Sequence, residues 1–145
     1  MPLILAAFVV LFIDLYSKHL VINNMQPHQS IPIIEDVFHI TYVYNYGAAF
    51  GILAGNIWFF ILVTAAVIVG MIIFYKKLAN QSVWVKCAFG MFAGGALGNL
   101  FDRIRFGKVV DFLDFRFWPV FNFADVAIVV GTAIFVFIIM FRENK

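Results

Sequence analysis

The chain of 145 residues is 64% hydrophobic, and only 12% of its residues are charged. Soluble domains are about half apolar and about a quarter charged, so this composition predicts an integral membrane protein. The net charge of +2 is small and no run of Lys and Arg alternates with aromatic residues, so we expect no nucleic-acid partner. The single cysteine, Cys87, excludes an intrachain disulfide.

Four apolar segments approach the length of about 20 residues that a helix needs to cross a bilayer. They cover residues 3–22, 57–75, 87–101 and 121–141. The sequence has no alternating ten-residue segments of the kind that build a membrane barrel, so the spans are expected to be helices. We predict an all-α membrane protein in which residues 1–145 form one domain, a bundle of four transmembrane helices. Because residues 2–13 contain no Lys or Arg, the first span is expected to be uncleaved.

A small β region is expected outside the membrane, at about residues 23–51, after the first helix. Residues 23–32 are rich in turn-forming residues, and residues 37–44 are rich in the β-branched and aromatic residues of a strand. The aromatic side chains of this region would suit a belt at the membrane interface: Phe38, Tyr42, Tyr44 and Tyr46. The later connections, residues 76–86 and 102–120, are expected to be a polar basic loop and a loop of mixed composition.

Four spans put both termini on one side of the membrane. Lys and Arg then divide equally between the two sides, so the positive-inside rule does not choose an orientation. The acidic residues do not divide equally, and most lie on the side away from the termini: Asp14, Glu35, Asp36, Asp102, Asp111, Asp114 and Asp125. We expect any chemistry on that side.

Asp111 and Asp125 are the most informative of these acids. Asp125 directly precedes the uncharged residues 126–141, and an ionisable group at the edge of a span costs about 3 kcal/mol, which favours a functional role. Asn122 and Asp125 also fit the start of a helix, where an Asn cap and an acid three residues later form a capping box.

Other polar residues lie within or beside the predicted spans. Asp14 and Lys18 are four residues apart, which predicts a salt bridge on one helix. Asn99, Asp102 and Arg103 share one helix face and need polar partners if they are buried. They follow a strip of glycines at four-residue spacing that would let another helix approach closely: Gly90, Gly94 and Gly98. Residues 45–51 predict a turn that brings backbone amides near a ligand.

Several kinds of catalytic site lack their residues in this sequence. The three histidines have no His-Glu-x-x-His spacing, which argues against zinc. The three serines are outside any Gly-x-Ser-x-Gly turn, and the glycines lack the ending of a phosphate-binding loop. Two aspartates that share one proton can hydrolyse a peptide bond. The helix dipole would favour ionised Asp125 as the base, with Asp111 as the acid.

Five sequence blocks match, in order, the motifs of a known family. They are DLYSK (14–18), NYGAAF (45–50), GGALGNLFDR (94–103), VVDF (109–112) and FNFAD (121–125). With these blocks the chain resembles the bacterial prolipoprotein signal peptidases, also called signal peptidase II.

The resemblance implies an aspartic-type endopeptidase of the bacterial inner membrane, with four transmembrane helices, both termini cytoplasmic and the active site near the outer face. Its substrate would be a diacylglyceryl-modified prolipoprotein, whose signal peptide is removed before the lipidated cysteine, in contact with membrane lipids. No metal or organic cofactor is expected.

The family's catalytic pair maps onto Asp111 and Asp125. Substrate-binding or supporting roles are implied for Asp14, Lys18, Asn45, Gly47, Asn99, Asp102, Arg103, Asn122 and Ala124. The sequence departs from the family at Leu15, where a Gln is common, and in the compact connection after Asp111, which makes Asp114 a rival member of the pair.

A small proton-coupled transporter or channel subunit is the alternative from another functional class, because buried Asp, Asn and Arg also mark ion pathways. Transporters commonly contain repeated halves, and the two halves of this chain do not resemble each other. An intramembrane protease of the presenilin type would carry a Gly-x-Gly-Asp signature, which is missing.

Overall fold

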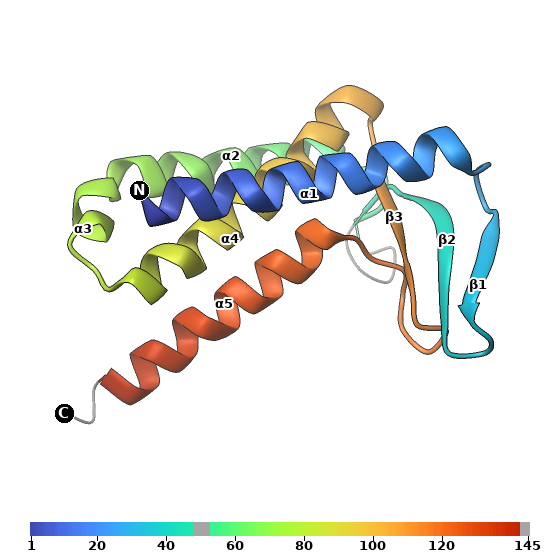
Figure 1. Cartoon of the computed structure of the whole chain (residues 1–145). Coiled ribbons are helices and arrows are strands. Elements are labelled where there is room, and N and C mark those ends of the chain that lie inside the picture. Colours follow the sequence, from blue (N-terminus) through green and yellow to red (C-terminus); the bar gives the residue numbers. More distant parts are fainter. Residues whose placement is uncertain (48–52, 143–145) are drawn as a thin grey trace.

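The computed structural model describes residues 1–47 and 53–142. Residues 48–51 of the predicted β region, and with them the end of the NYGAAF block, lie outside the described residues. The helices and strands are α1 (Pro2–Asn24), β1 (Ser30–Ile34), β2 (Phe38–Asn45), α2 (Ile57–Ile73), α3 (Tyr75–Ala79), α4 (Val83–Phe106), β3 (Val109–Asp114) and α5 (Phe123–Arg142). The helices lie side by side, the strands stand at one end of them, and the N-terminus and the end of α5 lie at the other end (Figure 1).

Helix α4 is the centre of the bundle and packs most extensively against α1 and α5. Its small residues allow this close approach. A Cβ atom on Gly94 would lie 2.5 Å from the carbonyl oxygen of Ala7 in α1, and one on Gly95 would clash with the carbonyl oxygen of Ala124 in α5. The predicted glycine strip is therefore confirmed as a packing surface, the kind that brings helices together where lipid removes the hydrophobic driving force.

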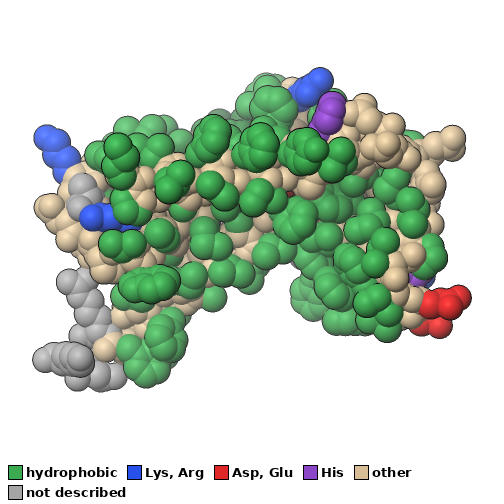
Figure 2. Space-filling view, in the orientation of Figure 1, with side chains coloured by type: hydrophobic (Ala, Val, Ile, Leu, Met, Phe, Trp, Pro, Cys, Tyr) green, Lys and Arg blue, Asp and Glu red, His purple; other side chains and the backbone are tan. Residues whose placement is uncertain are grey.

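The face shown in Figure 2 is covered mostly by apolar side chains, with Lys and Arg at the left end and at the upper edge, and Asp and Glu at the right end. Within residues 1–47 and 53–142, α1 and residues 123–141 of α5 have the length and apolar composition of a membrane span, and α2 is an apolar helix of 17 residues. Helix α4 is long enough but carries four charged residues: Lys86, Asp102, Arg103 and Arg105. Each predicted span thus contains a helix.

The strands form one antiparallel sheet in the order β1-β2-β3. The strand predicted at residues 37–44 is confirmed as β2. The prediction of a loop over residues 102–120 is wrong, because α4 continues to Phe106 and β3 follows. The predicted loop over residues 76–86 is also too long, because α3 occupies Tyr75–Ala79 and α4 begins at Val83. Strand β3 is almost completely buried, so its sequence lacks the polar and apolar alternation that reveals a half-exposed strand. Strand β1 likewise begins inside the stretch predicted as turns.

A small apolar core joins the sheet to the end of α1. Val21 of α1 packs with Tyr42, Val110 and Phe112 of the sheet. Tyr42 is only 2% exposed and its hydroxyl donates to that of Tyr44 at 2.6 Å, so Tyr42 belongs to this core and its predicted place in an interfacial belt is wrong. The core fixes the sheet at the end of the bundle, where the predicted site residues lie.

Candidate active site

A tight reversal of the chain brings β3 next to the start of α5. The backbone N–H groups of Phe112 and Leu113 both donate to the carbonyl oxygen of Phe121, at 2.9 and 2.8 Å, and the N–H of Phe121 donates to Leu113 at 3.1 Å. The next residue, Asn122, therefore lies beside β3 and beside Asp111.

Asn122 contacts both predicted catalytic aspartates. Its amide Nδ2 donates to Oδ1 of Asp111 at 2.6 Å. Its Oδ1 accepts a bond from the backbone N–H of Asp125 at 2.9 Å, and its own N–H donates to Oδ2 of Asp125 at 3.3 Å. These reciprocal bonds confirm the predicted capping box. Asn122 is completely buried, so the geometry is held from within the protein.

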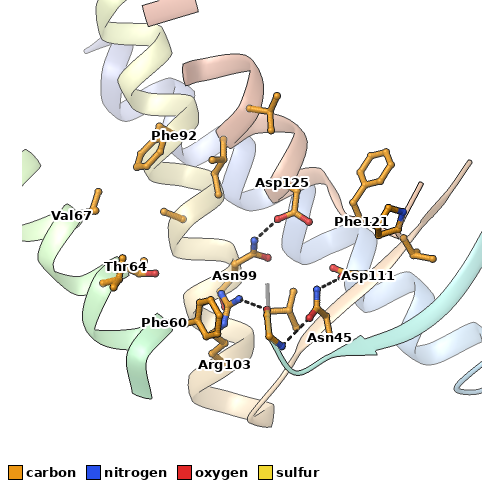
Figure 3. Close-up of a pocket in the computed structure, with 18 of the residues that line it drawn as sticks. Asn45, Phe60, Thr64, Val67, Phe92, Asn99, Arg103, Asp111, Phe121 and Asp125 are labelled. Atoms are coloured by element: carbon orange, nitrogen blue, oxygen red, sulfur yellow. Dashed lines mark hydrogen bonds between the residues drawn. The ribbon is translucent and has the colours of Figure 1, made fainter. Parts of the chain in front are cut away.

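Each aspartate also accepts a second amide. Asn45 of β2 donates to Oδ2 of Asp111 at 3.0 Å, and its own oxygen accepts the N–H of Gly47 at 2.9 Å. Asn99 of α4 donates to Oδ1 of Asp125 at 2.8 Å. Figure 3 shows these two hydrogen bonds on the wall of one cavity. Neutral amides therefore donate the hydrogen bonds that orient both carboxyl groups.

Both aspartates line a cavity of about 440 Å³. Helix α2 forms one wall with Phe60, Thr64 and Val67, which Figure 3 shows across from Asp125. The floor comes from α4, and the opposite wall comes from α5 and residues 118–121. The lining is mostly apolar, so the surroundings of the two carboxyl groups are less polar than bulk water. Sequence reasoning missed the apolar lining residues, because nothing in an apolar span distinguishes a residue facing a cavity from one facing lipid.

Asp111 is 2% exposed. Its burial raises its pKa to about 7, and the negative charge of Asp125 contributes to the rise, whereas the amides of Asn45 and Asn122 oppose it. Asp111 is therefore still partly protonated near neutral pH, beside the charge of Asp125.

A buried ionic cluster lies behind the cavity. The ammonium group of Lys18 is 2.7 Å from Asp14, which confirms the predicted salt bridge, and 3.0 Å from Asp102. It also donates to Oδ1 of Asn99 at 3.1 Å, and the amide of Asn99 in turn bonds to Asp125. Lys18 is thus connected to the aspartate pair through one neutral amide.

The two acids of this cluster bind backbone N–H groups next to the site. Asp14 accepts the N–H of Ala124 at 2.9 Å, and Asp102 accepts the N–H of Val110 at 3.1 Å. Ala124 and Val110 immediately precede Asp125 and Asp111 in the sequence. The side chain of Ala124 is fully buried against the glycines of α4, which explains why a small residue stands there.

Arg103 joins the remaining elements. Its guanidinium donates to the carbonyl oxygen of Gly47 at 3.3 Å and lies 4.6 Å from the ring centre of Phe60 on α2. The structure therefore brings every residue of the predicted site to the cavity or to the cluster behind it. Within residues 1–47 and 53–142, no group of three or more His, Cys, Asp or Glu side chains could hold a metal ion.

The rival acid, Asp114, is directed elsewhere. It lies three residues after Asp111 on the same strand, so the two side chains project from opposite faces. Asp114 accepts bonds from Thr41 at 2.7 Å and from the backbone and guanidinium of Arg116 at 2.8 and 2.9 Å. Leu15 is half-buried on α1, one residue after Asp14.

Comparison with known proteins identifies the family. A family model described as "Signal peptidase (SPase) II" matches residues 6–141. The chain belongs to the signal peptidase II family. It is 49% identical to the lipoprotein signal peptidase of Halothermothrix orenii over 140 residues, which cover 97% of this chain and 96% of that relative. It is also 49% identical to the lipoprotein signal peptidase of Moorella thermoacetica over 134 residues, with 92% and 89% covered.

Solved structures agree with this assignment. A bacterial membrane enzyme solved by the in meso method is 32% identical and superposes with a TM-score of 0.88, covering 98% of this chain and 88% of that chain. A second is 33% identical with a TM-score of 0.85, covering 94% and 91%. Together with the apolar helices, membership of the signal peptidase II family assigns this chain to a bacterial membrane.

Proposed function

We propose that the protein is an aspartic-type endopeptidase that removes the signal peptide of diacylglyceryl-modified prolipoproteins, immediately before the lipidated cysteine. One observation carries the proposal: Asp111 and Asp125, from separate elements, line one cavity and share Asn122 as a hydrogen-bond partner. Family membership supports the substrate, because the relatives are named lipoprotein signal peptidases.

The two aspartates would divide the work of hydrolysis. Ionised Asp125, in the first turn of α5, takes a proton from a water molecule, whose oxygen attacks the scissile carbonyl carbon. Protonated Asp111 donates a hydrogen bond to the carbonyl oxygen as negative charge develops there. When the C–N bond breaks, a proton passes to the leaving amine of the cysteine, and the signal peptide leaves as a carboxylic acid.

The substrate would enter from the membrane. A second apolar cavity of about 280 Å³ shares Val67 and Phe92 with the first and continues between α2 and α5 along α4. This groove suits an apolar signal segment, whereas the lipid on the cysteine stays in the bilayer. An anchored substrate presents its cleavage point at a fixed depth, which shortens the search for the site.

In this arrangement the bundle crosses the membrane four times, with both termini cytoplasmic and the cavity near the outer face of the inner membrane. Apolar flanks on the helices and the position of the sheet opposite the N-terminus support this topology. The rival reading, a proton-coupled transporter, is not favoured, because the polar groups gather at the sheet end of the bundle.

Purified protein in detergent, given a diacylated and an unmodified form of one precursor, tests the function. We expect cleavage of the diacylated form alone, before the cysteine by mass spectrometry, and an unchanged rate with a metal chelator. Equal cleavage of both forms would contradict the substrate assignment, and loss of activity with chelator would contradict the carboxylate mechanism.

A further inference from the structure

The connection between β3 and α5 forms a wall of the cavity close to Asp111. Trp118, Pro119 and Val120 from this connection line the cavity directly before Phe121. The backbone bonds between Leu113 and Phe121 close the connection into a short loop, so its conformation depends on few residues. Trp118 is 54% exposed, so about half of its surface is accessible where it lines the cavity.

Asp114 anchors the start of this loop. It is 4% exposed and binds Thr41 of the neighbouring strand and both the backbone and the guanidinium of Arg116. Burial alone would raise the pKa of Asp114, but the hydrogen bonds from Thr41 and Arg116 outweigh it and hold the pKa below its usual value. The acid is therefore ionised at neutral pH and pairs with Arg116, whose side chain is 48% exposed.

Arg116 sets the direction of the residues that follow. Its φ of 67° lies in the left-handed region, which is unfavourable for a residue with a side chain and persists where surrounding contacts enforce it. The two bonds to Asp114 support this conformation, together with the bond from the N–H of Phe117 to the carbonyl oxygen of Phe115 at 2.8 Å. Trp118 follows two residues later and lines the cavity.

The position of Trp118 fits one part of the proposed substrate better than the other. The long apolar groove along α4 runs away from this wall and suits the signal segment. An indole combines an apolar ring with one N–H donor, which suits groups that are partly apolar and rich in carbonyl oxygens, such as a glyceryl ester at a membrane interface.

We propose that Trp118 contacts the glyceryl ester part of the lipidated cysteine and sets the specificity for it, and that Asp114 is a positioning residue that holds Trp118 in place through Arg116. This inference rests on the proposed function and adds a residue pair outside the aspartate dyad.

Steady-state kinetics on the diacylated precursor test the contact. Trp118→Ala should raise KM by about tenfold or more, as the loss of a buried aromatic contact does, and leave kcat within about threefold of wild type. Trp118→Phe should recover most of the loss. Phe117→Ala is the matched control, because the neighbouring Phe117 is 83% exposed and should leave both constants unchanged. A kcat defect without a KM change in Trp118→Ala would overturn the proposal.

Two competitors separate the lipid from the peptide. A diacylglyceryl-cysteine amide should inhibit Trp118→Ala about tenfold more weakly than wild type, whereas the signal peptide alone should inhibit both equally. The opposite pattern would show that Trp118 contacts the peptide and would overturn the lipid assignment. Neither result affects whether the wild-type enzyme cleaves the lipidated precursor, so the proposed function is tested independently of this inference.

A double-mutant cycle tests the positioning role. Asp114→Ala should raise KM as Trp118→Ala does, and the double variant should show no further rise, because both changes remove one contact. Arg116→Ala is a second test, because it removes the ion pair and leaves Asp114 bonded to Thr41. It should raise KM severalfold. The positioning role would be overturned if the increases in KM of the two single variants multiplied in the double variant, or if Arg116→Ala had a normal KM.

Discussion

At the scale of single residues, neutral amides donate the hydrogen bonds to the two aspartates, and the ammonium group of Lys18 lies behind one of these amides. Asn45, Asn99 and Asn122 supply the donors. Lys18 pairs with Asp14 and Asp102, and it is linked to Asp125 through the side chain of Asn99. A lysine in direct contact would favour ionisation of both carboxyl groups, and the pair would lose the proton that the acid must donate. The amide of Asn99 between Lys18 and Asp125 therefore orients Asp125 as the base, and Asp111 can keep the proton that it donates.

Asn122 combines a structural and a chemical role, and substitution can separate them. Serine caps a helix as well as Asn does but cannot reach Asp111 with an amide. We therefore expect Asn122→Ser to lower kcat by about tenfold or more, with a melting temperature below that of wild type, because buried amide bonds are lost, but above that of Asn122→Ala. Asn122→Ala should lose the cap as well and be less stable by about 1 kcal/mol. Near-normal kcat in Asn122→Ser would refute the role of the amide.

The raised pKa of Asp111 predicts how the enzyme responds to pH. The acid must be protonated, so kcat/KM should fall as pH rises through about 7. Between the usual value of 3.8 and about 7 the folded protein holds a proton that the unfolded chain has lost, so stability should fall as pH rises across this window. Thermal unfolding of wild type and Asp111→Asn across that range checks this, because Asn cannot titrate. Parallel curves for the two proteins would contradict the assignment.

At the scale of elements, the contact between α1 and α4 depends on the absence of side chains. A methyl group on Gly94 would press on the backbone of Ala7, so Gly94→Ala should force the helices apart and cost about 1–3 kcal/mol of stability. Gly70 of α2 is the matched control, because a Cβ there meets no described atom within 4 Å. Gly70→Ala should keep the melting temperature or raise it slightly. Equal melting temperatures for the two variants would show that the strip does not hold the helices.

The sequence predicted α1, α2, α5, the middle of α4 and β2, because apolar length and β-branched content are local signals. It did not predict α3, β3 or the end of α4 at residues 102–106. Strand β3 pairs with β2, which lies far away in the sequence. The end of α4 is charged and therefore resembles a loop in the sequence. In the structure, Asp102 at this end pairs with Lys18 and accepts the backbone N–H of Val110. These elements therefore depend on contacts with residues that are distant in the sequence.

The candidate site could be predicted to a similar degree. Acids beside apolar spans and the family motifs identified the residues that meet at the cavity. The bonding pattern could not be predicted, because Lys18 is 81 positions away from its partner Asn99 and no local signal connects them. The wall of residues 118–120 carries no motif of its own, so only the structure shows that it faces the aspartates.

At the scale of the whole molecule, Lys18 ties three parts of the fold together. Its partners Asp14 and Asp102 bind the backbone at the starts of α5 and β3, so one buried ammonium group supports both elements that carry the aspartates. Lys18→Met would leave two buried carboxyl groups without a cation, which costs about 3–5 kcal/mol. The melting temperature should fall sharply, whereas Lys76→Met, at an exposed position on α3, should leave it unchanged. A Lys18→Met variant as stable as wild type would show that the cluster is not a structural support.

The pairing of Asp111 with Asp125 is the claim on which the proposed function depends. The most direct measurement is the turnover of a diacylated precursor by Asp111→Asn and Asp125→Asn, with Asp36→Asn, an exposed aspartate on the β1–β2 hairpin, as the control. Both dyad variants should lose at least about a thousandfold in kcat while their melting temperatures show an intact fold, and the control should retain full turnover. Near-normal turnover in either dyad variant would contradict the account.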